Sequence, residues 1–210
     1  MNKLIAAGTL LFLSLIPAKA GAEGSAPVVA QVLAPNLFAS GAKEFQSAIG
    51  PFFFTDNNPN NRPAIDFVFE SLRLGVMLSN PHGSNFLAGS FELLGELFAD
   101  PVVSGPGDVA TGLTLFLRYN FVQPRARVLP YAQIGAGGVY TDIPEKESGG
   151  LISLPVEFNL QGIVGTRMIL NDYWSFLIEA GYRHISNAEI KKPNFGIDSV
   201  GGNVGFGFFF

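Results

Sequence analysis

A histidine and a serine two positions apart, His184 and Ser186, are the residues of this sequence whose types and spacing best suit chemistry. Residues i and i+2 of a β-strand point to the same face and lie about 6.6 Å apart at the backbone, so the imidazole can reach the seryl oxygen. A serine beside a general base is the arrangement that nucleophilic acyl transfer uses. Taken alone, the pair is weak evidence, because two polar residues that end a strand at an interface give the same pattern.

The segment that carries this pair, residues 174–186, alternates between an apolar and a polar face. The apolar face holds Trp174, Phe176, Ile178, Ala180 and Tyr182, and the polar face holds Ser175, Glu179 and Arg183. His184 and Ser186 have the parity of the apolar face. We therefore expect both to project from the apolar side of a strand, at its end.

The composition favours a β-rich membrane protein. Glycine (25 of 210 residues) and phenylalanine (20) are frequent, and only 14% of the residues are charged although 48% are hydrophobic. The net charge of −4 offers no footprint for nucleic acid. The absence of cysteine excludes disulfides, thiolate catalysis and cysteine-based zinc sites, and two histidines make a histidine-rich metal site improbable. We expect neither a metal nor a cofactor.

From Glu44 onward the chain falls into eight segments of about ten residues, several of which alternate with period two. Alternation is clearest in 86–97, 113–121 and 157–168, is also present in 174–186 and 199–210, and is less regular in 44–54, 64–78 and 129–140. In the segment 64–78 the parity of the apolar residues switches between Phe69 and Leu72, which predicts a β-bulge.

These segments predict an all-β fold, an eight-stranded antiparallel transmembrane β-barrel of the outer membrane. An even number of strands can close without edges, as a bilayer requires, and no later stretch reaches the 18 apolar residues of a helical span. The barrel interior should be filled by a mixed-sign polar set rather than form a pore: Glu92, Glu96, Arg118, Glu157, Arg167, Glu179 and Arg183. A soluble lipocalin-like barrel is the alternative, but it would enclose these charges at a cost.

The N-terminus resembles a secretory signal peptide. A short basic start precedes an apolar stretch from Leu4 to Ile16, and an Ala-x-Ala pattern ends at Ala20. We therefore predict a signal peptide at 1–20, an N-terminal extension at 21–43 that is periplasmic, and the barrel domain at 44–210.

Loop lengths predict the orientation of the barrel. With both termini periplasmic, the longer loops 55–63, 98–112, 141–156 and 187–198 lie outside, and the shorter turns 79–85, 122–128 and 169–173 lie in the periplasm. The terminal Phe206-x-Phe208-x-Phe210 run resembles the C-terminal signal that the barrel assembly machinery reads.

The residues that follow the histidine and serine resemble a known family. The stretch Tyr182-Arg183-His184-Ile185-Ser186-Asn187 and its continuation to Asn194-Phe195-Gly196-Ile197-Asp198 look like the signature of the lipid A 3-O-deacylases, the PagL family. In that family a His-x-Ser-Asn near the end of strand seven is followed by Asn-x-Gly and an acidic residue. The specific match covers about 17 residues.

By this resemblance Ser186 is the nucleophile, His184 is its general base, and Asp198 is the acid that orients the imidazole. The family usually carries Glu at the position of Asp198. The parity of Asp198 points its side chain outward, and Asp198 lies at the start of strand eight, beside the end of strand seven. The geometry therefore permits Asp198 to pair with His184. Glu189 in the intervening loop is the alternative acid, and its other interpretation is a solvated loop charge.

Two asparagines complete the predicted site. The resemblance implies that Asn194 donates its amide to the oxyanion and that Asn187 is a second asparagine of the substrate-binding site. Ordinary turn chemistry is the alternative for both. Lys191 and Lys192 either attract lipid A phosphates or form a solvated pair, and His82 falls in a periplasmic turn without a predicted role.

The resemblance implies an outer-membrane serine esterase that removes the 3-O-linked acyl chain of lipid A and releases a 3-hydroxy fatty acid, with its site toward the outer leaflet. Lipopolysaccharide and outer-membrane lipids are then its partners. A non-enzymatic structural or adhesive barrel and an esterase of outer-leaflet phospholipids are the alternatives. A monomer and a homodimer are both compatible with the sequence.

Overall fold

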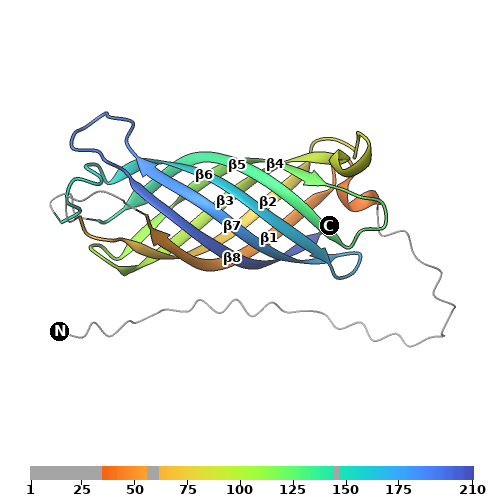
Figure 1. Ribbon diagram of the computed structural model, residues 1–210, viewed down its shortest axis with the longest axis horizontal. Coiled ribbons are helices and arrows are strands. Elements are labelled where there is room, and N and C mark those ends of the chain that lie inside the picture. Colours follow the sequence, from red (N-terminus) through yellow and green to blue (C-terminus); the bar gives the residue numbers. More distant parts are fainter. Residues whose placement is uncertain (1–34, 56–61, 144–146) are drawn as a thin grey trace. The chain divides into compact units, whose positions relative to one another are not determined.

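The computed structural model describes residues 35–55, 62–143 and 147–210, which form a closed antiparallel barrel of eight strands (Figure 1). Each strand pairs with the next along the chain, and β1 pairs with β8. The predicted fold is confirmed. The strands are β1 (Lys43–Phe54), β2 (Asp66–Met77), β3 (Gly89–Ser104), β4 (Val109–Phe121), β5 (Val128–Thr141), β6 (Val156–Ile169), β7 (Trp174–Ser186) and β8 (Ile197–Phe209).

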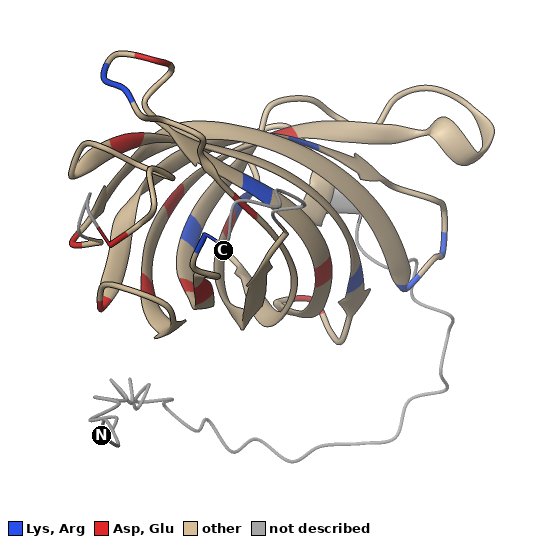
Figure 2. Cartoon of the chain, turned by 60° about the vertical axis from the view of Figure 1, so that its left-hand side comes forward, with Lys and Arg blue, Asp and Glu red and all other residues tan. Residues whose placement is uncertain are grey.

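Side chains alternate between an apolar outside and a largely polar interior. In β4 the outward residues Leu113, Leu115 and Leu117 are exposed, whereas Thr114, Phe116 and Arg118 between them are buried. All seven predicted inward charges are buried, and charged bands mark the strands in Figure 2. A lipocalin-like barrel would place its apolar face inside, so the observed arrangement contradicts that alternative.

The interior charges form ion pairs across the barrel. Arg73 contacts Glu96 at 2.7 Å and Glu179 at 2.6 Å, and Arg183 pairs with Asp100. Arg118 and Arg167 pair with other buried carboxylates, Glu92 and Glu44. Because each cation has a partner of opposite sign, these groups can remain charged away from solvent.

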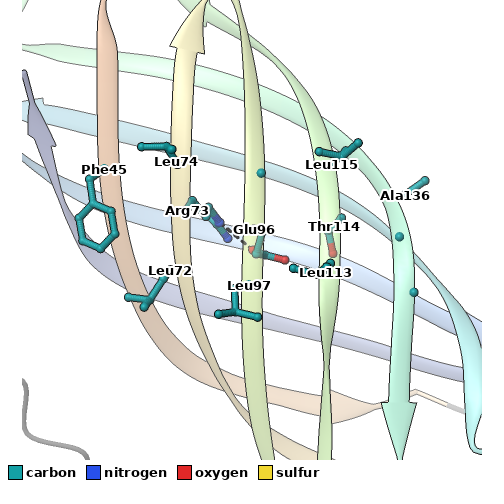
Figure 3. A pocket seen from close by; sticks show the side chains of 13 residues that line it. Phe45, Leu72, Arg73, Leu74, Glu96, Leu97, Leu113, Thr114, Leu115 and Ala136 are labelled. Atoms are coloured by element: carbon teal, nitrogen blue, oxygen red, sulfur yellow. Dashed lines mark hydrogen bonds and ion pairs between the residues drawn. The ribbon is translucent and has the colours of Figure 1, made fainter.

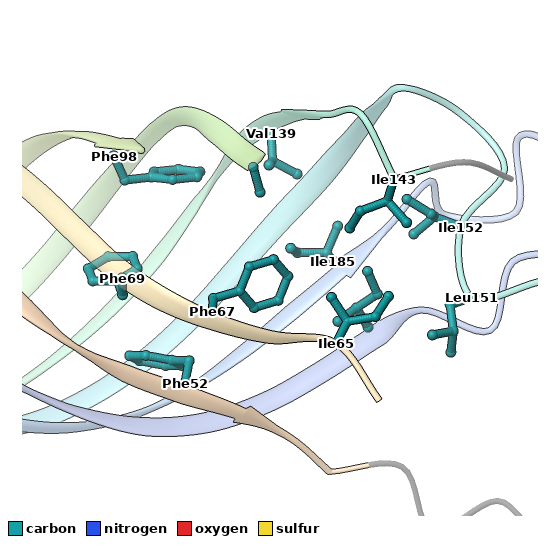
Figure 4. Packing of buried hydrophobic residues seen from close by; sticks show 12 residues of the cluster. Phe52, Ile65, Phe67, Phe69, Phe98, Val139, Ile143, Leu151, Ile152 and Ile185 are labelled. Atoms are coloured by element: carbon teal, nitrogen blue, oxygen red, sulfur yellow. The ribbon is translucent and has the colours of Figure 1, made fainter. Parts of the chain in front are cut away.

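The bulge predicted in β2 is absent, and that prediction was wrong. Phe67 and Phe69 point inward in the same alternation as Ser71 and Arg73, and the register shift on this strand lies between Asp66 and Phe67. The inward residues of β2 are apolar near its start and polar further along. The switch in apolar parity therefore comes from the residues that line the interior and not from an irregular backbone. Figure 4 shows the apolar cluster at this end, which includes Phe52, Phe67, Phe69, Phe98, Ile143, Leu151 and Ile185.

The loop predicted at 98–112 was also wrong, because β3 runs to Ser104 and β4 begins at Val109. Gly105 and Gly107 in the connection have φ of 94° and 86°, a conformation that glycine adopts without strain. At the opposite end, residues 78–88 form a longer connection than predicted and contain the short 3-10 helix η2 (Asn85–Leu87). The difference in loop length between the two ends of the barrel is therefore smaller than the sequence indicated.

Part of the predicted extension closes the barrel end opposite the β7–β8 loop. The 3-10 helix η1 (Pro35–Phe38) places Phe38 inside, with its ring centroid 5.7 Å from that of Phe209, and Gly41 donates its N–H to the carbonyl of Met77 at 2.8 Å. The barrel begins at Lys43, one residue before the predicted boundary. The predicted signal peptide 1–20 and residues 21–34 lie outside the described residues. In the described part of the chain, no helix is both long and apolar enough to cross a membrane.

Candidate active site

The site residues lie on the outward face of the barrel where β7 ends and β8 begins. His184 and Asp198 are directly opposite each other in the β7–β8 register, and Ser186 is two residues further along β7. Arg183 and Ile185, which alternate with them, are buried inside. The structure thus presents the histidine and serine on the side that the alternation predicted.

Two hydrogen bonds join the three side chains. His184 Nε2 lies 2.8 Å from Ser186 Oγ, and His184 Nδ1 lies 2.6 Å from Asp198 Oδ1. With a proton on Nδ1, the ring donates to the carboxylate and its Nε2 accepts from the serine hydroxyl. The arrangement can remove a proton from Ser186 while a carboxylate stabilises the imidazolium that forms.

Asp198, and not Glu189, is the acid beside the imidazole. Glu189 forms an ion pair with Lys192 at 3.4 Å, and both side chains are 73% exposed. The side chains of His184 and Asp198 are 29% and 37% exposed, so their contact is shielded more fully from solvent. Glu189 and Lys192 therefore match the interpretation that they are solvated charges of the loop.

Gly196 lies directly against the imidazole of His184. It has φ of 84°, and a Cβ built on it would lie 2.6 Å from His184 Cε1. Only a residue without a side chain lets the loop backbone approach the ring this closely. The Asn-x-Gly spacing is visible in the sequence, but the contact with His184 was not predicted from it.

The two predicted asparagines have different surroundings. Asn187 donates its backbone N–H to Asn194 Oδ1 at 3.1 Å, which turns the carbonyl end of the Asn194 amide toward the loop and leaves its Nδ2 as the donor end. The Asn187 side chain is buried and donates to Ser153 Oγ and to the carbonyl of Lys191, each at 3.0 Å. Asn187 therefore holds the loop, and its side chain does not join the hydrogen-bonded series of Ser186.

Ser153, which sequence reasoning missed, links two loops. Its hydroxyl donates to the carbonyl of Lys191 at 2.9 Å, and Lys191 Nζ donates to the carbonyl of Ser153 at 3.0 Å. The Ser153 and Leu154 N–H groups donate to the buried Glu157 carboxylate at 3.2 and 2.9 Å. Lys191 is thus engaged within the loops. No local sequence pattern marks the contacts between Ser153 and Lys191, because these positions lie 38 residues apart.

Backbone contacts add to this link between residues 147–155 and the loop 187–196. Phe195 and Gly196 donate their N–H groups to the carbonyls of Gly150 and Leu151 at 3.1 and 2.7 Å. The guanidinium carbon of Arg62 lies 3.5 Å from the centroid of the Phe195 ring. The loop that carries Asn194 is therefore fixed at its backbone as well as at its side chains.

Other candidate features lie away from this site. His82 forms a bridge with Gly89, and its Nδ1 contacts the carbonyl of Asn80 at 3.1 Å. A depression of about 580 Å³ is formed by residues of β1 to β5, among them Leu72, Leu97, Leu113 and Leu115, and shares no residue with the site (Figure 3). The described ranges contain no group of three or more His, Cys, Asp or Glu that could hold a metal ion.

Comparison with known proteins shows both a family and a fold. A family model described as lipid A 3-O-deacylase (PagL) matches residues 68–207. The crystal structure of the outer membrane enzyme PagL aligns with a TM-score of 0.51 and 16% identity, over 77% of this chain and 97% of that one. Neisserial surface protein A (NspA) aligns with a TM-score of 0.54 and 14% identity, over 81% and 98%. No curated protein sequence matches this chain. At these identities the structural likeness shows the fold alone, whereas the family match spans His184, Ser186 and Asp198.

Proposed function

The chain belongs to the lipid A 3-O-deacylase (PagL) family, and from this membership we propose that it is an outer-membrane serine esterase that hydrolyses the 3-O-linked acyl chain of lipid A. The observation that carries the proposal is the hydrogen-bonded series of Ser186, His184 and Asp198 on the outward face of the barrel. A nucleophile, a base and an acid joined by hydrogen bonds form the arrangement that nucleophilic acyl transfer uses. Two polar residues that only end a strand at an interface would need no acid beside them.

The first half of the proposed reaction forms an acyl-enzyme. Ser186 Oγ attacks the ester carbonyl carbon while its proton passes to His184 Nε2, and Asp198 stabilises the imidazolium. The tetrahedral oxyanion accepts from Asn194 Nδ2 and from backbone N–H groups. The intermediate collapses with cleavage of the bond to the sugar oxygen, and that oxygen takes the proton from His184 Nε2.

The second half releases the fatty acid. His184 Nε2 removes a proton from water, which attacks the acyl carbon on Ser186. Collapse of the second tetrahedral intermediate breaks the bond to Ser186 Oγ, which recovers its proton from the imidazolium. The products are a 3-hydroxy fatty acid and lipid A with a free hydroxyl, and the site returns to its starting protonation.

An outward-facing site suits a substrate that stays in the bilayer. The residues opposite Ser186 and His184 on β6 are Phe158 and Leu160, both outward and exposed. The acyl chain can remain against this apolar wall while only the ester contacts Ser186. We place the site at the level of the outer leaflet, where lipid A is found, with the C-terminal strand end in the periplasm.

We propose two further partners, the barrel assembly machinery and a second copy of the chain. Phe206, Phe208 and Phe210 have the outward parity that a C-terminal signal for the barrel assembly machinery requires. A homodimer is compatible with the fold, and cross-linking of the folded protein in detergent would test it.

Mass spectrometry of the products tests the proposal. Purified wild type and the variant Ser186→Ala are each given lipid A and phospholipid in the same detergent. We expect the wild type to release a 3-hydroxy fatty acid from lipid A, and Ser186→Ala to lose this activity while it folds normally. Ser47→Ala is the matched control, because Ser47 also faces outward, on β1.

Three results would contradict the proposal. Full activity in Ser186→Ala would remove the serine from the chemistry. Cleavage of phospholipid but not lipid A by the wild type would indicate the other esterase. Intact lipids in every sample would favour a structural or adhesive barrel.

A further inference from the structure

Tyr182 contacts the acid of the candidate site from the same strand as the histidine. It lies on β7 two residues before His184 and shares its outward face. Its hydroxyl donates to Asp198 Oδ1 at 2.5 Å, and this is the oxygen that His184 Nδ1 contacts at 2.6 Å. Two donors therefore converge on one carboxylate oxygen, which fixes the carboxylate from two directions.

Asp198 needs such an anchor because little else holds it. Its side chain is 37% exposed on the outer face of the barrel, so packing does not enclose the carboxylate. Among the described residues, Tyr182 and His184 supply the side-chain hydrogen bonds to its carboxylate. A bond from a hydroxyl to an ionised carboxylate is among the stronger hydrogen bonds, so it can select one orientation of a short side chain.

The tyrosine is also placed so that its hydroxyl needs this partner. Its side chain is exposed on the apolar wall of the barrel, beside Val200 of β8. A hydroxyl in hydrocarbon without a partner costs free energy, and the Asp198 carboxylate satisfies it there. The same contact thus orients the acid and satisfies the tyrosine.

We propose that Tyr182 is a positioning residue of this site, which holds the Asp198 carboxylate in the orientation that accepts a hydrogen bond from His184. This inference rests on the proposed function and deepens it. The orientation must exist before the reaction, because a preorganised carboxylate stabilises the imidazolium without rearrangement at the moment of proton transfer.

The variant Tyr182→Phe removes only the hydroxyl and keeps the ring on the apolar wall. Tyr119→Phe is the matched control, because Tyr119 is an outward tyrosine on β4, three strands away from β7, and its hydroxyl also donates a hydrogen bond, to the carbonyl of Leu87 at 2.7 Å. Three quantities are measured on folded protein in detergent: the rate at which a fluorophosphonate labels Ser186, the kcat for lipid A and the KM for lipid A.

We expect Tyr182→Phe to slow the labelling of Ser186 and to lower kcat, each by about 10- to 100-fold, as the loss of one hydrogen bond to a charged group predicts. KM should not change, because the tyrosine acts on the acid and not on the substrate. Tyr119→Phe should match the wild type in all three quantities. Equal labelling rates in Tyr182→Phe and the wild type, or no labelling of Ser186 in the wild type, would overturn the inference.

A double-mutant cycle with Asp198→Asn separates a positioning role from a direct contact with substrate. If Tyr182 acts through Asp198, its substitution has little further effect once the carboxylate is gone. Independent, multiplicative losses would overturn the inference. If Tyr182→Phe slows labelling while lipid A remains intact with the wild type, the positioning role stands and the proposed substrate fails.

Discussion

At the scale of single residues, the contact between Gly196 and His184 sets where the imidazole lies. A methyl group at position 196 would meet His184 Cε1 at 2.6 Å and the carbonyl oxygen of Ile185 at 3.3 Å. A displacement of the base by about 1 Å is enough to lower the rate of an enzyme about 100-fold.

We therefore predict that Gly196→Ala lowers kcat for lipid A by about 100-fold. Gly41→Ala is the control, because Gly41 also has a positive φ, of 87°, but a Cβ there has no neighbour within 4 Å. Both variants carry the same kind of backbone strain, and only the first displaces the imidazole. Steady-state kinetics that show equal activity in the two variants would contradict this account of Gly196.

Spacing and parity were sufficient to predict the face on which His184 and Ser186 lie, because a strand alternates regardless of what surrounds it. The partner across the β7–β8 pair, Asp198, followed from the order of the segments and the resemblance to the family. The roles of Tyr182 and Gly196 could not be predicted, because each depends on a contact distance that alternation does not fix.

At the scale of elements, residues 147–155 hold the loop 187–196 in place. Ser153 accepts from Asn187 Nδ2 and donates to the carbonyl of Lys191, and Asn187 in turn donates to Asn194. The series runs from a loop after β5 to the proposed oxyanion donor after β7. Spacing along the chain cannot reveal it, because loops without a periodic pattern do not disclose their partners.

We predict that Ser153→Ala lowers kcat about tenfold with little change in KM, because a looser loop leaves Asn194 less well placed for the oxyanion. Ser153→Thr should restore most of the activity, since it retains the hydroxyl. Kinetics on lipid A in mixed micelles measure both variants. Wild-type kcat in Ser153→Ala would show that the link between the loops has no effect on the site.

The strands themselves were predicted well where their inward residues are polar, as in β6 and β7. Prediction failed where the interior is apolar, because both faces of β2 then look alike, and the inward Phe67 and Phe69 produce a switch in apolar parity that resembles a bulge. The ends of β3 and β4 were missed since the alternation there includes Pro101, Ser104 and two turn glycines.

At the scale of the whole molecule, the barrel interior contains the buried ion pairs, and the outer face contains the residues of the proposed chemistry. Glu179 is buried beneath the wall of β7 and accepts from Arg73 at 2.6 Å and Tyr131 at 2.8 Å. Removal of one partner from a buried ion pair leaves an uncompensated charge, which typically costs about 3 to 5 kcal/mol.

We predict that Glu179→Gln lowers the free energy of unfolding by about 3 kcal/mol, at the low end of this range, because Arg73 loses one of its two carboxylate partners and keeps Glu96. Glu189→Gln, in the exposed pair with Lys192, should change it by less than about 1 kcal/mol. Urea unfolding of the folded barrel in lipid vesicles measures both. Equal stabilities of the two variants would mean that the interior network contributes no more than a surface pair.

The most direct test of the central claim is fragmentation mass spectrometry of lipid A from cells that produce either the wild type or Ser186→Ala. The account predicts that lipid A with the wild type lacks one 3-hydroxyacyl chain, at position 3, and that lipid A with Ser186→Ala keeps it. Unmodified lipid A in both samples, or a chain missing from any other position, would contradict it.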